Sequence, residues 1–427
     1  MLRASAASGL VLATQKLDGI TGEGTSLLSM ASRPLRILFA APVWAPSRAF
    51  GGPVVAAGEL VRRLVAHGHT VDVVTTTILD LERRPAARSA VELVDGATVH
   101  YLATPVRYRW MGITPTLPIA LARLRRPDVV HIFGFRDPIT TGTAAWCRIR
   151  RVPYVFEPLG MFEPRLRKVF LKRALDATLY RGVARGAAAV VVASPRERAA
   201  VIACGVDPGK VHVRGNGFPD PDDRGTADGA LRTQLRIPAE APLILYVGRI
   251  AAGKGIEHLI EAVRQIPAAH LVVAGPDDRH GASALLRQAQ SAAATTGRVH
   301  TLPVTEEPPR DLYPQADVFV LASAGESFGM VAAEAAAAGT PIVVTDRCGI
   351  AGFFKDGEAL IVPYDGAAVV DAVRSVLSDA KVRERLARGG VAAARRTSWD
   401  RVADLQEEIY RAAASRTAAT KLSTEGS

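Results

Sequence analysis

The strongest constraint in this sequence is a regular alternation of two patterns, buried strands and amphipathic helices. Leu35–Ala41 (LRILFAA) is a continuous apolar run, as expected of a strand buried on both faces, and Pro53–His67 has apolar residues at helical spacing. Further strand-like runs occupy Thr70–Thr77, Asp128–Phe135, Pro153–Leu159, Ala188–Ser194 and Val211–Arg214. Strands separated by helices in this way predict a parallel sheet that is covered by helices.

The alternation stops at a segment rich in turn residues, Gly215–Asp228, and then starts again. The second series of predicted strands covers Leu243–Val247, His270–Ala274, Val299–Leu302, Asp317–Ala322, Pro341–Thr345 and Leu360–Val362. Its predicted helices cover Ile256–Gln265, Ala282–Thr296, Phe328–Ala338 and Ala367–Leu377. The predicted fold class is therefore α/β, with two tandem Rossmann-like, doubly wound domains that face each other across a cleft. Ligands are expected beyond the carboxyl ends of the strands.

The same patterns set the expected domain boundaries. We expect a first domain over 33–220, a linker over 221–240, a second domain over 241–397 and a C-terminal helix over 398–415. The ends, 1–32 and 416–427, are expected to be disordered, and the short apolar patch in the first of them does not resemble a secretory core.

Composition excludes several classes of protein. Of the 427 residues, 48% are hydrophobic and 22% charged, which argues against disorder, and no run approaches the ~20 apolar residues of a membrane span. The three cysteines are far apart, which excludes a disulfide framework and fits a reducing cytosol. The expected location is therefore cytoplasmic.

The charge is concentrated in the first half of the chain. Residues 1–220 carry 30 basic and 16 acidic residues, whereas the remainder carries 23 and 26. The basic half predicts an anionic partner, which could be nucleic acid, an acidic lipid surface or a phosphorylated acceptor, or only an Arg-rich surface with no special partner. The basic segment Arg165–Gly186 could lie against an anionic membrane face, or it could be a core helix with a basic solvated side.

Two cations follow the first strand of the second series. Gly248-Arg249 comes directly after LILYV, and Lys254-Gly255 precedes a predicted helix. A strand, a glycine-bearing turn and a helix N-terminus form a generic anion site, and two cations beside it would suit a diphosphate. The alternative is a surface lysine and arginine that flank an ordinary turn.

Two glutamates with seven residues between them bound the segment ESFGMVAAE, Glu326–Glu334. The helix Phe328–Ala338 is apolar all round and is therefore predicted to be buried. A carboxylate inside it, Glu334, is costly unless it is hydrogen-bonded, and it could accept from two vicinal hydroxyls of a ribose. Glu326 precedes the helix N-terminus, where acids are also favoured for electrostatic reasons alone.

Three segments together resemble the retaining GT-B glycosyltransferases of the family-four class. They are GRIAAGKG, ESFGMVAAEAAAAGTPIVV and GGPVVAAGELVRRLVAHGHTVDVVT, and DGEALIVPYD is similar to the closing signature of that family. The resemblance extends from about Leu35 to Tyr410. It implies a nucleotide-diphosphate sugar as donor, held mostly by the second domain, and transfer with retention at the anomeric carbon, without a metal or other cofactor.

The resemblance also implies roles for individual residues. Arg249 and Lys254 would contact the diphosphate, Glu334 the ribose hydroxyls and Glu326 the hydroxyls of the donor sugar. The other donor-binding residues would be Gly248, Ser327, Phe328 and Gly329, with Gly51 and Gly52 on the opposite wall. The C-terminal helix would cross back onto the first domain.

The chain departs from the family pattern at three places. Phe133 and Leu159 stand where many relatives have histidines, and Cys348–Phe354 lacks an acid that relatives often carry. His131 and Glu157 are the remaining polar candidates on the acceptor side, and His131 is therefore a candidate catalytic residue with Glu326, Arg249 and Lys254. The alternative for His131 is a satisfied core histidine.

The leading hypothesis is a glycosyltransferase that acts at the inner membrane face on a glycan or lipid-linked acceptor and does not bind nucleic acid. A sugar-nucleotide epimerase of the same fold, which needs no acceptor, is a second hypothesis. A non-enzymatic protein that binds a polyanion or a membrane is a third.

Overall fold

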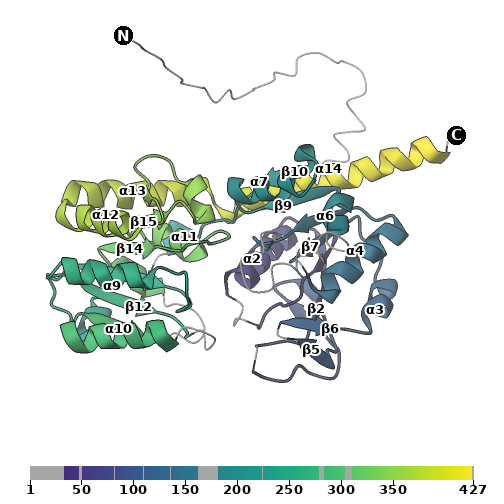
Figure 1. Cartoon of the computed structure of the whole chain (residues 1–427). Helices are drawn as coiled ribbons and strands as arrows, with labels where there is room; N and C mark the ends of the chain where they lie inside the picture. The colour runs from purple at the N-terminus through teal and green to yellow at the C-terminus, as the bar shows by residue number, and fades with distance from the viewer. Residues whose placement is uncertain are drawn as a thin grey trace, which may run out of the picture. The chain divides into compact units, whose positions relative to one another are not determined.

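The computed structural model describes residues 33–47, 51–80, 82–108, 110–134, 136–161, 181–223, 225–277, 283–302 and 310–425 of the chain. These residues form two sheets, each with helices on both faces (Figure 1). The predicted α/β class with two doubly wound, Rossmann-like units is confirmed.

The first sheet has eight strands in the order β10-β9-β8-β7-β1-β2-β4-β3. They are β1 (Arg36–Ala40), β2 (Thr70–Thr76), β3 (Ala90–Val94), β4 (Ala97–Leu102), β7 (Val129–Phe133), β8 (Tyr154–Glu157), β9 (Ala189–Val192) and β10 (Val211–Val213). All neighbours pair in parallel except β3 with β4. Chain progression reverses between β1 and β7, which is the switch point where ligands of such sheets bind.

Helices cover both faces of this sheet because successive strand side chains point to opposite sides. Ile37 and Phe39 of β1 pack in one core with α2 (Gly52–Ala66) and α14 (Trp399–Glu425). Leu38 and Ala40 of the same strand belong to the core on the other face. The helices of that second core are α3 (Leu117–Arg123), α4 (Pro138–Arg150), α6 (Arg181–Gly186) and α7 (Pro195–Ala203).

The second sheet has six parallel strands in the order β13-β12-β11-β14-β15-β16. They are β11 (Leu243–Val247), β12 (His270–Ala274), β13 (Val299–Leu302), β14 (Val318–Leu321), β15 (Ile342–Thr345) and β16 (Leu360–Val362). One face carries α9 (Ile256–Gln265), α10 (Ser283–Thr296) and α12 (Gly366–Ser378), and the other carries α11 (Met330–Ala337) and α13 (Ala380–Arg396). The switch point lies between β11 and β14.

The helix α14 joins the end of the chain to the first sheet. Its residues Val402, Ala403, Ile409 and Tyr410 are buried in the same core as α2. The helix continues to Glu425, so the expectation of disorder from residue 416 is wrong for the residues up to 425.

Several other expectations differ from the structure. Neither β3 and β4 nor the hairpin of β5 (Val106–Tyr108) and β6 (Met111–Ile113) was predicted from the sequence. The segment expected to be a linker contains η4 (Pro221–Asp223) and α8 (Ala230–Leu235), whose Leu231 is buried in the second core. The basic segment Arg165–Gly186 lies outside the described residues except for α6.

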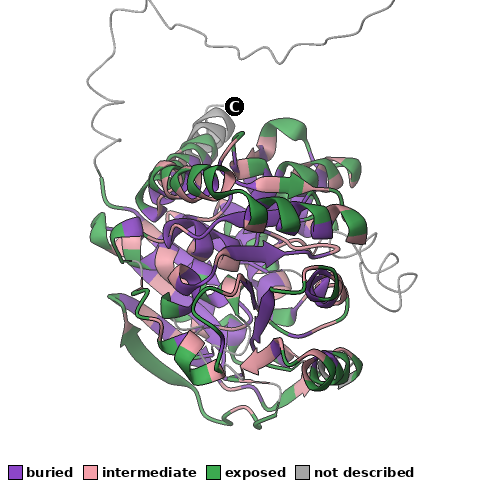
Figure 2. Cartoon of the chain, turned by 90° about the vertical axis from the view of Figure 1, so that its left-hand side faces the viewer, coloured by how far each residue is buried: buried purple, intermediate pink, exposed green. Residues whose placement is uncertain are grey.

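Burial follows the layers: the central strands of both sheets are buried, and the outward sides of the helices are exposed (Figure 2). Among the helices of the described residues, none is both long and apolar enough to cross a membrane.

Candidate functional site

The predicted donor segments meet at the switch point of the second sheet. β11 and β14 are adjacent strands whose following connections lead to opposite sides of the sheet. Gly248 and Arg249 follow β11, and Glu326 and Ser327 follow β14. Parallel strands end at the same edge, so these residues, which are about 80 positions apart in the chain, are brought to one place.

Lys254 and Glu326 form an ion pair across this switch point, from Nζ to Oε2. Their side chains remain 21% and 26% exposed, so both can still be reached from solvent. Arg249 is exposed, and its backbone carbonyl accepts a hydrogen bond of 2.9 Å from the Tyr246 hydroxyl. The sequence analysis placed Lys254 and Glu326 in one site, and the structure brings them into contact.

Two helix N-termini open at the same edge. α9 begins after Gly255 and α11 after Gly329, and neither cap residue supplies a side-chain hydrogen bond. Both glycines have positive φ values, 72° and 111°. A Cβ at position 255 would lie 2.0 Å from the Ala322 carbonyl oxygen. The first N–H groups of both helices are therefore not capped by a side chain, which is the arrangement that favours an anion.

The environment of Glu334 differs from the expectation. α11 is buried through five alanines, but Met330, Val331 and Glu334 lie on an edge that is only half-buried. The Tyr313 hydroxyl donates a hydrogen bond to Oε2 of Glu334. The prediction that the helix is buried all round is therefore wrong at Glu334, and the hydrogen bond that a buried carboxylate was expected to need comes from a tyrosine of η5 (Arg310–Gln315). Helical periodicity alone cannot show that this tyrosine reaches it.

The loop that carries Glu326 and Ser327 is held by backbone hydrogen bonds to the next strand connection. The N–H of Glu326 donates to the carbonyl of Arg347 at 3.2 Å, and the carbonyl of Glu326 accepts from the N–H of Gly349 at 3.1 Å. The N–H of Ile350 donates to the carbonyl of Phe328 at 2.8 Å. The side chains of this loop are therefore displayed from a fixed backbone, which a binding site requires.

The same loop contacts the first half of the chain. Ser327 Oγ donates to the carbonyl of Leu159 at 3.0 Å, and a Cβ at Gly160 would lie 2.1 Å from that hydroxyl oxygen. The N–H of Gly160 donates to Oε1 of Glu197, whose Oε2 accepts from the N–H of Ala193 at 2.9 Å. The loop after β8 is thus held between α7 and the Glu326 loop.

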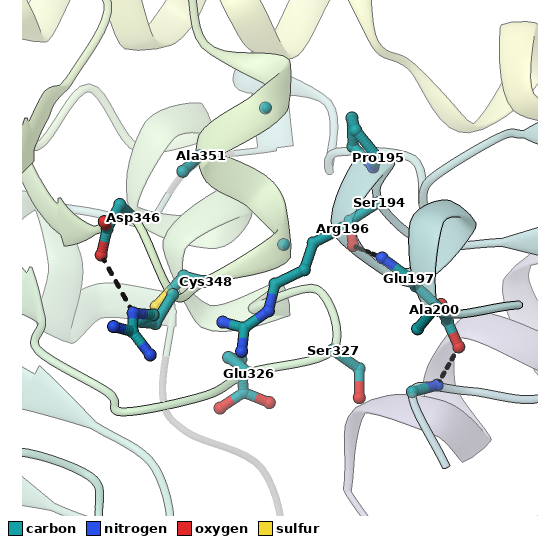
Figure 3. A pocket seen from close by; sticks show the side chains of 14 residues that line it. Ser194, Pro195, Arg196, Glu197, Ala200, Glu326, Ser327, Asp346, Cys348 and Ala351 are labelled. Carbon is teal, nitrogen blue, oxygen red and sulfur yellow. Dashed lines mark hydrogen bonds and ion pairs between the residues drawn. The ribbon is translucent and has the colours of Figure 1, made fainter. Parts of the chain in front are cut away.

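A pocket of about 180 Å³ lies at this junction (Figure 3). Glu326 and Ser327 line it from one half, together with Asp346 and Arg347, and Gly160 lines it from the other. Arg196 of α7 also lines the pocket, and Figure 3 shows its side chain extending toward Glu326. The other predicted site residues are not among the residues that line this pocket.

The contribution of α7 to this pocket was not predicted from the sequence. The Ser194 side chain caps α7 by accepting a hydrogen bond from the N–H of Glu197. The carboxylate of Glu197 in turn accepts a hydrogen bond from the N–H of Gly160, in the loop after β8. The motif S-x-x-E directly after a strand-like run is the signature of a capping box and could have revealed this helix start.

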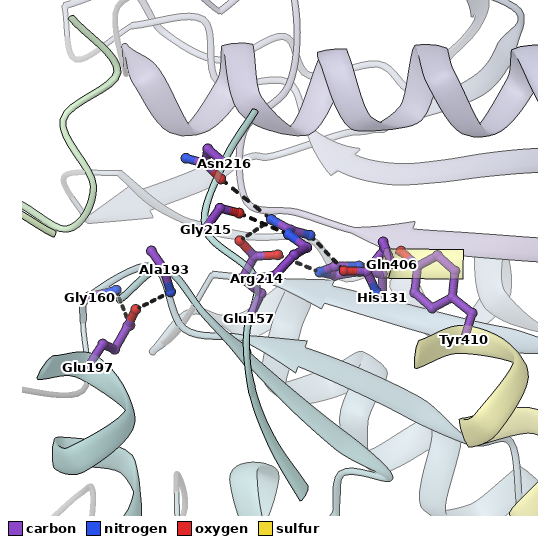
Figure 4. A network of polar contacts seen from close by, with 10 residues as sticks. All are labelled: His131, Glu157, Gly160, Ala193, Glu197, Arg214, Gly215, Asn216, Gln406 and Tyr410. Carbon is purple, nitrogen blue, oxygen red and sulfur yellow. Dashed lines mark hydrogen bonds and ion pairs between the residues drawn. The ribbon is translucent and has the colours of Figure 1, made fainter. Parts of the chain in front are cut away.

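His131 and Glu157 do not line the pocket but lie in the buried core of the first sheet (Figure 4). His131 Nε2 is 3.1 Å from Oε2 of Glu157, and His131 Nδ1 is 2.5 Å from the hydroxyl of Tyr410 in α14. Arg214 donates to Glu157 Oε1 at 2.9 Å and to Gln406 at 2.7 Å. The complete burial of His131 agrees with the alternative of a core histidine and not with a direct contact with an acceptor, although its Nε2 makes no hydrogen bond within the described residues.

The protonation states in this network follow from burial. Burial lowers the pKa of His131 by more than the contact with Glu157 raises it, so the ring is neutral. Burial acts to raise the pKa of Glu157, but the charge of Arg214 and the contact with His131 outweigh it, and the pKa is lowered. A neutral His131 thus faces the Glu157 carboxylate with Nε2 and the Tyr410 hydroxyl with Nδ1.

Gly51 and Gly52 lie at the N-terminus of α2, at the switch point of the first sheet. Gly51 has φ 67° and provides no side-chain cap. A Cβ at Gly52 would lie 3.3 Å from Cγ of Met330 in α11, whereas a Cβ at Gly51 would meet nothing within 4 Å. The structure therefore places Gly52 beside α11.

Comparison with protein families gives two matches that divide the chain. The family described as glycosyl transferases group 1 matches residues 228–391, and the glycosyl transferase 4-like domain matches residues 51–217. The boundary between the two matches falls in the segment that the sequence analysis identified as turn-rich.

Curated relatives match over different lengths. A D-inositol 3-phosphate glycosyltransferase of Thermomonospora curvata is 32% identical over 404 residues, which are 84% of this chain and 90% of that protein. A protein of the same name from Xylanimonas cellulosilytica is 36% identical over 53% of this chain and 57% of its own. An alpha-maltose-1-phosphate synthase of Mycolicibacterium smegmatis is 31% identical over 48% of this chain and 58% of its own. The chain thus spans little more than half of the last two.

Solved structures share the fold. Sucrose-phosphate synthase of Thermosynechococcus elongatus superimposes with a TM-score of 0.70 at 22% identity, over 89% of this chain and 98% of that one. HepE of Anabaena, solved with UDP-glucose, gives a TM-score of 0.68 at 19% identity, over 88% and 98%. These likenesses establish the arrangement of two Rossmann-like units.

Proposed function

Because the chain belongs to the GT-B glycosyltransferases of group 1 and family-four type, we propose that it transfers a sugar from a nucleotide-diphosphate donor to a hydroxyl of an acceptor, with retention of the anomeric configuration. The observation that carries this proposal is the Lys254–Glu326 pair between two N-termini without side-chain caps at the switch point of the second sheet. This site combines positive charge and N–H groups, which would bind a diphosphate, with a carboxylate that would accept hydrogen bonds from sugar hydroxyls.

The diphosphate would bind at the N-terminus of α9, where Lys254 and Arg249 add two positive charges. These charges stabilise the leaving group in which negative charge develops during transfer. Gly51 and Gly52 would approach the same phosphates from the first half, since neither carries a side chain that would intervene. Gly248 would allow the turn that brings Arg249 to the site.

The two glutamates would hold the two sugars of the donor. Glu326, at the carboxyl end of β14, would accept hydroxyls of the transferred sugar, while the backbone of Ser327, Phe328 and Gly329 lines its other side. Glu334 would accept hydroxyls of the ribose with the oxygen lone pairs that Tyr313 does not occupy.

Transfer would proceed at the front face of the donor sugar. The acceptor oxygen bonds to the anomeric carbon as the bond to the diphosphate oxygen breaks, and the acceptor proton passes to that leaving oxygen. This step needs no protein nucleophile and no metal ion. It also agrees with the burial of His131 and Glu157, which line no part of the pocket.

The acceptor would be bound on the side of the first half, with α7 and the loop after β8. A glycan or a lipid-linked sugar, made in polysaccharide or glycolipid biosynthesis, is our primary proposal, with the protein located in the cytoplasm. A phosphorylated polyol is a second candidate, supported by Arg196 in the pocket and by the name of the relative that matches along most of the chain.

The proposal is tested by incubating the purified chain with UDP-, GDP- or ADP-sugars that raise its melting temperature, since a ligand that binds only the native state stabilises it. Each such donor is then offered a lipid-linked glycan or D-inositol 3-phosphate. We expect NMR to show a product with the anomeric configuration of the donor, and we expect the rate of transfer to be unchanged when a metal chelator is present. An inverted product contradicts retention, and an epimerised sugar nucleotide formed without acceptor contradicts transfer.

A further inference from the structure

The hairpin β5–β6 presents an apolar face that no other described element covers. In its antiparallel register Val106 is opposite Ile113 and Tyr108 is opposite Met111. Opposed residues share one face of a sheet, and positions two apart along a strand share it too. These four side chains therefore form one face of the hairpin, which lies at the lower edge of the view in Figure 1.

The other face of the hairpin is turned onto the protein. Arg107 Nη1 donates to the carbonyl of Asp80 at 2.5 Å. A Cβ at Gly112 would lie 2.6 Å from Thr104 and 3.0 Å from Ile78, so only glycine fits against those side chains. The apolar face is consequently directed outward: Val106, Tyr108 and Ile113 are 57%, 63% and 49% exposed.

The segment that carries this face and α3 is basic in sequence, while the nearby acid Asp80 lies on the inward side with Arg107. Residues 96–127 contain five arginines and no acidic residue. Arg123 and Arg125, at and after the end of α3, are exposed, and so is the apolar Ile119 within that helix. The half-buried Trp110 stands in the turn between the two strands. Exposed aliphatic and aromatic residues flanked by arginines are typical of segments that sit at a membrane interface.

Charge decides between the possible occupants of this face. In a symmetric contact with a second copy, the exposed Arg123 and Arg125 of each copy would face those of the other, and the segment 96–127 has no acid to pair with them. A nucleic acid would satisfy the arginines but would leave the apolar face unpartnered. An anionic bilayer provides both negative headgroups and an apolar boundary.

We propose that the β5–β6 hairpin and α3 form a docking surface for an anionic lipid bilayer, in which Val106, Tyr108, Met111 and Ile113 enter the interface and the arginines bind headgroups. Docking by this surface does not depend on the proposed transfer reaction. The surface is also distinct from Arg165–Gly186, the segment that the sequence indicated for a membrane contact and that lies mostly outside the described residues.

The test is co-sedimentation of the full chain with vesicles of phosphatidylglycerol and phosphatidylcholine in equal parts, and with vesicles of phosphatidylcholine alone. We expect binding to the anionic vesicles that weakens with salt. The double variant Tyr108→Ser/Ile113→Ser should weaken it at least about tenfold, because each apolar side chain loses its burial. The matched control is Val91→Ser/Leu93→Ser on β3, whose side chains are 63% and 77% exposed and which should bind as the wild type does.

A second pair of variants tests the charge. Arg123→Gln/Arg125→Gln should weaken binding to anionic vesicles about ten- to thirtyfold, and Arg264→Gln/Arg374→Gln, exposed on the second half, should not. Brominated lipid should quench tryptophan fluorescence in the wild type but much less in Trp110→Phe. Equal binding by the hairpin variant and the wild type, or self-association without vesicle binding, would overturn the proposal. Transfer to a soluble acceptor is measured separately, so failure of docking is distinguishable from failure of the proposed function.

Discussion

Lys254 and Glu326 are ion-paired although they follow different strands, because β11 and β14 diverge at the switch point of the second sheet. The pair sits between two helix N-termini, at the place where an anionic leaving group and sugar hydroxyls would have to meet. This relationship is the centre of the proposed donor site, and it yields the first prediction.

Replacing either partner should remove sugar transfer while the fold is retained. We expect Lys254→Ala and Glu326→Ala each to lower kcat about 10²–10³-fold, as for the loss of one preorganised charge. The stability cost should be about 1 kcal/mol or less, because the pair is partly solvated. Steady-state kinetics and thermal unfolding check both effects. Arg264→Ala, at the exposed end of α9, is the matched control, and normal turnover in either site variant would disprove the assignment.

Tyr313 should position Glu334 for the donor. Tyr313→Phe removes the hydroxyl that donates to Glu334 Oε2, which is worth about 0.5–1.5 kcal/mol. We expect KM for the donor to rise about two- to tenfold with little change in kcat. Glu334→Ala should raise it further, and the double variant should equal Glu334→Ala alone, because the hydroxyl acts through the carboxylate. Unchanged donor KM in both single variants would refute the ribose assignment.

His131 should matter for stability and not for chemistry. His131→Ala removes the contact of His131 with Glu157, which keeps Arg214, and the partner of the Tyr410 hydroxyl. It also opens a cavity, for a combined cost of about 2–5 kcal/mol. Tyr410→Phe, which removes one hydroxyl only, should cost about 1 kcal/mol. Denaturant unfolding measures both, and the specific activity of the folded fraction should be maintained. A stable His131→Ala protein without activity would restore His131 as a catalytic candidate.

The attachment of α14 to the first half should weaken in acid. Burial acts to raise the pKa of Glu407, but hydrogen bonds from Arg411 and His69 outweigh it and lower the pKa from 4.5 to about 2. A lowered carboxyl pKa means that the unfolded chain binds more protons, so the stability that Glu407 contributes is present above pH 4.5 and is lost as the pH falls toward about 2. Unfolding curves across this range should show a shallower pH dependence in Glu407→Gln than in the wild type. Identical slopes would contradict the role of this contact.

Local patterns were sufficient for most of the architecture. The strand β11 is a continuous apolar run, β1, β7 and β12 are mostly apolar, and α9 begins and ends where helical spacing predicts. The edge strand β3 was missed because it is exposed along most of its length and carries no buried-strand pattern. The short hairpin β5–β6 has too few residues for periodicity to appear.

The order of residues alone established that strands and helices alternate in two series, and that Lys254 and Glu326 follow two different strands of the second series. Buried runs and helical periodicity are properties of neighbouring residues, so a local pattern can reveal them. Only three-dimensional packing decided that Glu334 receives the Tyr313 hydroxyl, that His131 is enclosed with Glu157 and Tyr410, and that α7 reaches the pocket. Each of these contacts joins segments that are far enough apart in the chain for no local pattern to encode their approach. Solvent exposure and hydrogen-bond satisfaction depend on which distant segment arrives beside a side chain.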